Sequence, residues 1–208
     1  MRYITDPTQI LVSPGVVGSA VYLASYSNSP HYAGAARSGF VYSYDAKSGT
    51  LNWQHPIDDL VLSTPTVVND IVYVGSYDTN LYALKTSDGS ELWHYTTGGQ
   101  IFGSPLVSNG VVYVTESGNA SPTNPVSTVN AALFAIDATK GTELWSQPLD
   151  ITLQTIQNGV IYGGVFPRAV YALKVSDGST IWHQQYGPDL IDKTGTHGGP
   201  APQITVIP

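Results

Sequence analysis

The chain has 208 residues, of which 42% are hydrophobic and 11% are charged, and its formal net charge is −7. The net charge argues against nucleic acid binding, which needs a basic patch, and the eight Lys and Arg residues are scattered. Cysteine is absent, so disulfides, thiolate metal sites and cysteine catalysis are excluded.

The start of the chain, MRYITDPTQILVSPGVV, lacks the apolar run of a signal peptide. No segment approaches the roughly 18 apolar residues that a membrane span requires. Either the protein is cytoplasmic or a leader has been removed from it. A composition in which Tyr, Ser, Thr, Asn and Gly replace charged residues favours an extracytoplasmic location, meaning periplasmic, cell-surface or secreted.

Short apolar runs separated by turn residues recur along the chain. The clearest set is TPTVV (64–68), IVYVGSY (71–77), LYALK (81–85) and ELWHYT (91–96). β-Branched and aromatic residues dominate the runs while Asn, Asp and Gly fill the gaps, as in strands joined by tight hairpins. No run has the length or period of a helix. Each set therefore predicts a four-stranded antiparallel meander with strands A to D.

Such a sheet is apolar on both faces and must bury them against neighbours, as the blades of a β-propeller do. A solenoid is the alternative, but its repeats usually carry one or two strands. We predict an all-β fold, with one β-propeller domain over residues 1–208. The predicted parts are blade 1 at about 10–58, blade 2 at about 60–98, blade 3 at about 101–149, blade 4 at about 151–187, and an extra strand A at 201–208.

Each predicted blade contains one copy of a motif with a glycine four residues before a closing tryptophan. The copies are SYDAKSGTLNW (43–53), ALKTSDGSELW (83–93), AIDATKGTELW (135–145) and ALKVSDGSTIW (172–182). The glycines are Gly49, Gly89, Gly141 and Gly178, and the tryptophans are Trp53, Trp93, Trp145 and Trp182. The motif thus contains all four tryptophans of the chain.

This motif resembles the tryptophan-docking motif of the PQQ-like, quinoprotein-type β-propeller family. The resemblance implies that each tryptophan stacks on the first residue of its own motif and on the glycine of the next, and that its indole N–H bonds a carbonyl there. A ring close to another backbone needs a residue without a side chain. The implied pairs are Trp53 with Ser43 and Gly89, Trp93 with Ala83 and Gly141, and Trp145 with Ala135 and Gly178. Asp45 and Asp137 match the family's third motif position, whereas Lys85 and Lys174 do not.

No fifth motif follows Trp182, so three arrangements stay open. A closed ring of four blades would dock Trp182 on Gly49, with residues 201–208 as an edge strand. A homodimer could complete a larger ring, eight blades being the common number in the family. Alternatively, the chain is part of a longer protein. An open propeller exposes apolar faces and a strand edge, so we expect closure by some route.

The longest predicted loops leave one face of the propeller. In an A-to-D meander the B–C and D–A connections share one end, and the long ones span 27–39, 117–130 and 183–200. Binding residues concentrate on such loops, although insertions without a partner would look the same. The candidate binding residues are Tyr26, His31, Tyr32, Arg37, Glu116 and Asn124.

Catalytic signatures are missing. His55, His94 and His183 follow the tryptophans as a repeat feature of an outer strand, and adjacency of Asp58 and Asp59 does not make an acid–base pair. No GxSxG, HExxH or phosphate-binding glycine loop is present. The sequence predicts no catalytic, cofactor-binding or metal-binding residue and favours a non-enzyme without deciding the question.

PQQ enzymes of the similar family stack the quinone between a tryptophan and a vicinal cysteine pair, and coordinate calcium with acidic and amide groups. This chain has no cysteine and commits its tryptophans to docking, so neither PQQ nor calcium is expected. The main hypothesis is a non-catalytic scaffold or binding module with a protein or polysaccharide partner on the long-loop face. The alternatives are a partial or degenerate PQQ-dependent quinoprotein dehydrogenase and a sensor segment of a larger signalling protein.

Overall fold

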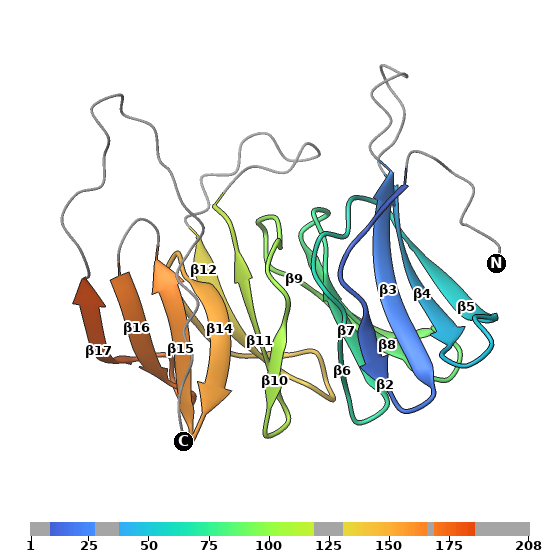
Figure 1. Cartoon of the computed structure of the whole chain (residues 1–208). Coiled ribbons are helices and arrows are strands. Elements are labelled where there is room, and N and C mark those ends of the chain that lie inside the picture. The colour runs from blue at the N-terminus through green and yellow to red at the C-terminus, as the bar shows by residue number, and fades with distance from the viewer. Residues whose placement is uncertain (1–8, 28–37, 119–130, 166–168, 186–208) are drawn as a thin grey trace, which may run out of the picture.

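The computed structural model describes residues 9–27, 38–118, 131–165 and 169–185, which form strands and turns in an arc of four sheets (Figure 1). In these ranges there is no helix long and apolar enough to cross a membrane. The predicted all-β fold of four antiparallel blades is confirmed. The predicted extra strand at 201–208 lies outside the described residues.

Blades 2 to 4 are meanders in which consecutive strands pair, and blade 1 differs in having two short strands that both pair with its third strand. Blade 1 contains β1 (Gln9–Leu11), β2 (Gly15–Val17), β3 (Ala20–Ser27), β4 (Ser38–Asp45) and β5 (Leu51–Ile57). Blade 2 contains β6 (Thr66–Val68), β7 (Ile71–Gly75), β8 (Asn80–Lys85) and β9 (Glu91–Thr96). Blade 3 contains β10 (Leu106–Ser108), β11 (Val111–Glu116), β12 (Ala132–Asp137) and β13 (Glu143–Gln147). Blade 4 contains β14 (Thr152–Gln157), β15 (Val160–Val165), β16 (Ala169–Lys174) and β17 (Thr180–Gln185).

The innermost strand of blade 1 is interrupted. β1 pairs with the second half of β3, where Gln9 lies opposite Ser27, and β2 pairs with the first half, where Gly15 lies opposite Tyr22. Both short strands therefore occupy the place that a single strand A fills in each other blade. Pro14 stands in the break, where its missing N–H costs no ladder hydrogen bond.

The turns between strands A and B of the blades contain asparagine, aspartate and glycine because their backbone is left-handed. Asn69 and Asp70 both have positive φ angles, at 50° and 62°, and Asn109 and Gly110 follow with 50° and 75°. Two left-handed residues in succession define the type I′ turn, whose twist matches that of antiparallel strands. These turns fix the register in which β6 and β10 meet their partner strands.

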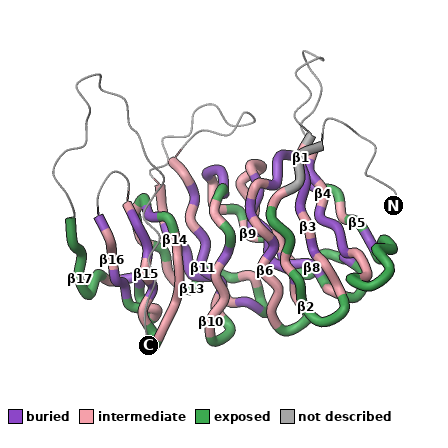
Figure 2. Tube along the Cα trace, in the orientation of Figure 1, coloured by how far each residue is buried: buried purple, intermediate pink, exposed green. Residues whose placement is uncertain are grey.

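The hydrophobic core lies between the blades. Side chains alternate along a strand, so β7 sends Val72 and Val74 toward blade 1 and Tyr73 toward blade 3. All three are buried, as are most residues of the central strands, whereas β17 is exposed along its whole length (Figure 2). A blade in the middle of the arc is therefore covered on both faces.

The closed ring of four blades considered from the sequence is wrong. Trp182 is 46% exposed, and a Cβ built on Gly49 would meet no described atom within 4 Å. The same contact joins each pair of neighbouring blades, so each step along the arc is similar. Three such steps leave blades 1 and 4 at opposite ends of an open arc (Figure 1).

Candidate binding edge and the tryptophan contacts between blades

The strand ends that flank the long insertions lie along one edge of the arc, the upper edge in Figure 1. β3 ends and β4 begins there, as do β11 and β12, and β17 ends there. We call this the long-loop edge. Four candidate binding residues lie outside the described ranges: His31, Tyr32, Arg37 and Asn124.

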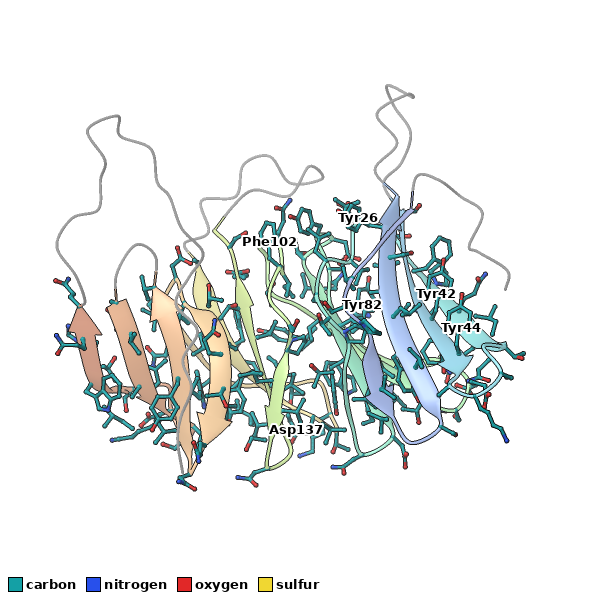
Figure 3. All side chains as sticks on the ribbon, in the orientation of Figure 1. Tyr26, Tyr42, Tyr44, Tyr82, Phe102 and Asp137 are labelled. Atoms are coloured by element: carbon teal, nitrogen blue, oxygen red, sulfur yellow. The ribbon has the colours of Figure 1, made fainter. Side chains whose placement is uncertain are left out.

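The other two candidates differ in their surroundings. Tyr26 lies in β3 opposite Gly39 and Ile10, close to the long-loop edge, and is half-buried (Figure 3). Glu116, at the end of β11, is only 3% exposed. Its carboxylate therefore does not offer a surface for a partner, although its position in the chain suggested one.

Glu116 instead fastens the connection between blades 2 and 3. One carboxylate oxygen accepts a hydrogen bond from the Gly99 N–H, while the other makes none to a described residue. Beside it the Ser117 N–H donates to the Gln100 carbonyl at 2.9 Å. Burial raises the pKa of Glu116, and the hydrogen bond from Gly99 offsets this only in part.

An aromatic pair that the sequence did not indicate occupies the same edge. The rings of Tyr77 and Phe102 meet edge to face, with centroids 4.4 Å apart and planes at 70°. Phe102 is 37% exposed, while the adjacent Ile101 is fully buried. The Tyr77 N–H donates to the Leu60 carbonyl at 2.9 Å. Tyr77 thus contacts both the connection of Leu60 and the ring of Phe102, which lies near the long-loop edge (Figure 3).

Each of three tryptophans lies against a glycine of the following blade. A Cβ on Gly89 would stand 2.5 Å from the ring of Trp53, and the Trp53 indole donates to the Thr86 carbonyl at 2.8 Å. The accepting carbonyl lies three residues before the glycine. Trp93 repeats the contact with Gly141 and the Ala138 carbonyl, and Trp145 repeats it with Gly178 and the Val175 carbonyl. The three tryptophans lie opposite Ser43, Ala83 and Ala135 in the strand register.

Aspartates organise the C–D turns at two alternative positions. Asp45 accepts hydrogen bonds from the N–H groups of Lys47 and Ser48, and Asp137 serves its own turn in the same way. Where Lys85 and Lys174 stand in place of these aspartates, an aspartate three residues later in the turn accepts the hydrogen bond. There Asp88 accepts from the Ser90 N–H and Asp177 from the Ser179 N–H.

The described histidines have the contacts of a solvated outer strand. His94 Nδ1 lies 2.8 Å from Glu91 Oε1, and His183 stacks on Tyr171 with centroids 5.2 Å apart. Asp59 is buried and accepts the N–H of Leu60, so it does not face a common substrate with the exposed Asp58. Within the described ranges no three His, Asp or Glu side chains group to hold a metal ion.

Comparison with known proteins gives consistent similarities. The family model described as outer membrane protein assembly factor BamB matches residues 37–185. The curated outer membrane protein assembly factor BamB of Moranella endobia (strain PCIT) is 26% identical over 195 residues, which cover 87% of this chain and 46% of that protein. The chain therefore spans about half the length of this relative.

Solved structures share the fold at low sequence identity. BamB from Moraxella catarrhalis superposes with a TM-score of 0.65 and 16% identity, over 87% of this chain and 51% of that chain. Quinohemoprotein alcohol dehydrogenase from Comamonas testosteroni gives a TM-score of 0.65 and 18% identity, over 85% of this chain and 35% of that chain. One blade architecture therefore serves proteins with different functions, and function has to be argued from the site.

Proposed function

Since the chain belongs to the PQQ-like repeat family of the outer membrane protein assembly factor BamB, we propose that it is a non-catalytic β-propeller scaffold that binds protein. The binding surface is the long-loop edge. The observation that carries the proposal is the exposed ring of Phe102, held by Tyr77 above a buried core. Aromatic side chains on a rigid support are the usual anchors of protein interfaces.

The partner in this proposal is a protein of outer-membrane assembly, by analogy with the relatives' name. The location would then be extracytoplasmic, which also suits the low charged fraction of the sequence. A polysaccharide partner has less support, because the relatives are named for protein assembly. The net charge of −7 continues to argue against nucleic acid.

A quinoprotein dehydrogenase is the competing function. The chain lacks the cysteine pair that the quinone would stack on, and Trp53, Trp93 and Trp145 are engaged between blades. We therefore expect that adding PQQ and calcium changes neither the absorbance spectrum nor the melting temperature. A stoichiometric, saturable shift in either would overturn the scaffold proposal. The full length of the gene tests the third hypothesis, a sensor segment of a signalling protein.

Site-specific photo-cross-linking tests the proposed edge directly. A photoreactive amino acid replaces Phe102 in one variant and Leu144, which is 52% exposed on the outer strand β13, in the control. In cells of the source organism we expect a discrete cross-linked protein of the outer-membrane assembly machinery from position 102 and none from position 144. Cross-linking from position 144 alone, or equally from both, would contradict the assignment of the edge.

A further inference from the structure

The two ends of the arc carry the two unmatched halves of one contact. Within the described residues, blade 4 presents a tryptophan that no glycine receives, and blade 1 presents a receiving glycine that no tryptophan contacts. We propose that two copies of this chain close into one ring, in which Trp182 of each copy docks on Gly49 of the other. This assembly is independent of the partner on the long-loop edge.

The exposure of Trp182 indicates that no described blade packs against it. Trp53 is 7% exposed, Trp93 and Trp145 are half-buried, and Trp182 is 46% exposed. The residue before the tryptophan provides an internal reference, since it points to the opposite side of the strand. It is equally exposed in blades 2, 3 and 4, at 43%, 52% and 46% for Leu92, Leu144 and Ile181. Among the described residues, blade 4 thus differs from blades 2 and 3 on its docking side.

Trp182 already has the orientation of a docked tryptophan. It lies opposite Ala172 in the strand register, and its ring is 6.2 Å from that of Tyr162, at an interplanar angle of 52°. The docked pair Tyr113 and Trp145 has 5.9 Å and 50°. A side chain held in its bound conformation loses little conformational entropy on association.

The receiving turn around Gly49 is also formed. Gly49 has a φ of 69°, compared with 72°, 67° and 70° for the three occupied glycines. Its N–H donates to the Asp45 carbonyl at 2.9 Å, the same bond that the Gly89 N–H makes to Lys85 at 3.0 Å. By the spacing of the other turns, the carbonyl of Ala46 would accept the Trp182 indole N–H. The Tyr162 hydroxyl would donate to the same carbonyl, since Tyr73 and Tyr113 do so at their sites.

The face of blade 1 around this turn is less buried than the corresponding face of blade 2, as expected if a second copy of the chain covers it. On blade 2 the receiving face is formed by Val72, Val74 and Leu84, each fully buried against blade 1. The strand register places Val21, Leu23 and Tyr44 at the corresponding positions of blade 1. These three are only half-buried.

A second copy of the chain is the one occupant that matches both ends of the arc. Each copy brings one free Trp182 and one free Gly49, so a twofold axis satisfies both contacts at once and removes the open ends. Two copies together supply eight blades, since the structure describes four in each.

The mass of the 208-residue chain in solution, measured by sedimentation velocity and light scattering, tests the proposal. We expect a dimer of twice 22.1 kDa. Trp182→Ala should weaken dimerisation by about tenfold or more, because a docked tryptophan and its hydrogen bond are lost. Ile181→Ala is the matched control, with equal exposure on the other side of the strand, and should leave the dimer intact.

Two further variants test the other end of the contact. Gly49→Asn keeps the left-handed backbone accessible but adds a side chain where the ring must lie, so it should give a monomer. Gly110→Asn, at a φ of 75° and with no described atom within 4 Å, should stay dimeric. A mixture of Trp182→Ala with Gly49→Asn restores one intact contact, and should dimerise more tightly than either variant alone. Circular dichroism checks that each variant is folded.

Three results would overturn the proposal. One is a monomer of 22.1 kDa for the unaltered chain. Another is an open polymer in place of a dimer, which would mean that the contact does not close on itself. The third is a dimer whose stability is unchanged by both Trp182→Ala and Gly49→Asn.

Discussion

Trp93 lies against Gly141 of the next blade so closely that a methyl group on this glycine would stand 2.6 Å from the ring. The indole N–H of Trp93 donates to the Ala138 carbonyl at 3.2 Å. One side chain thus joins two sheets both by packing and by a hydrogen bond. The recurrence of this pair along the chain is the reason that the blades form an arc.

Gly141→Ala should destabilise the protein by about 2–5 kcal/mol. The left-handed backbone costs an alanine about 1–2 kcal/mol, and the clash with Trp93 adds a cost of overpacking of about 1–3 kcal/mol. Gly110→Ala is the control, because Gly110 has a similar φ of 75° and open space around it. Urea unfolding measures both variants. If they lose the same stability, the tryptophan contact contributes nothing.

Ser63→Ala should cost about 2–6 kcal/mol of unfolding free energy. The Ser63 hydroxyl donates to the Gly75 carbonyl at 2.9 Å and accepts the Gly75 N–H at 2.8 Å. Ser63 lies shortly before the first residue of β6. Ser63 is fully buried, so its loss leaves two backbone groups unpaired, at about 1–3 kcal/mol each. Ser146→Ala, exposed on β13, should stay within about 0.5 kcal/mol. A loss that small for Ser63→Ala would show that water replaces the hydroxyl.

Acid should destabilise the C–D turns. Hydrogen bonds from Ser hydroxyls and backbone N–H groups lower the pKa of Asp45, Asp88 and Asp177, and backbone N–H groups do so for Asp137. A lowered carboxyl pKa contributes stability that is present above the unfolded value, about 3.9, and is lost as the pH falls through the folded value. We expect the melting temperature to fall below about pH 4.

The variant with all four turn aspartates changed to asparagine identifies the groups responsible. It should melt below the unaltered protein at neutral pH and approach it in acid, since asparagine does not titrate. Differential scanning calorimetry between neutral pH and about pH 2 gives both curves. Curves that stay parallel would assign the acid sensitivity to other carboxylates.

Glu116→Gln should change the pH dependence in the opposite direction. Burial raises the pKa of Glu116, so this residue favours the folded state most below its unfolded pKa, and that contribution is lost as the pH rises through the folded value. Glutamine still accepts the Gly99 N–H but carries no charge. The variant should therefore gain melting temperature relative to the unaltered protein as the pH rises. The exposed Glu91→Gln is the control, and an equal gain there would refute the assignment.

The fold could be predicted because the same pattern of strands and turns recurs along the chain. Alternating β-branched residues, Asn-containing turns and the glycine–tryptophan spacing all indicate the same meander, and the described strands follow it. Closure could not be predicted in this way. ALKTSDGSELW and ALKVSDGSTIW are nearly the same string, yet Trp93 is docked and Trp182 is exposed. A motif specifies its own blade and says nothing about whether a neighbour follows.

The candidate site was less accessible to sequence reasoning, because loop length was its only guide. The place of Glu116 before a long loop indicates a binding role, but the connection at Gly99 and Gln100 covers it. Tyr77 and Phe102 lie in short connections and come together only through the packing of blades 2 and 3. An aromatic residue beside the glycines of GGQIFGSP was the available signal for this pair.

The direction of the indole hydrogen bonds also bears on how the protein is made. Each docked tryptophan donates to a carbonyl 30 to 45 residues further along the chain. During synthesis the tryptophan of each blade is therefore made before the residues that accept its N–H. The nascent chain therefore acquires its native contacts one blade behind translation, and whatever receives Trp182 completes the final step.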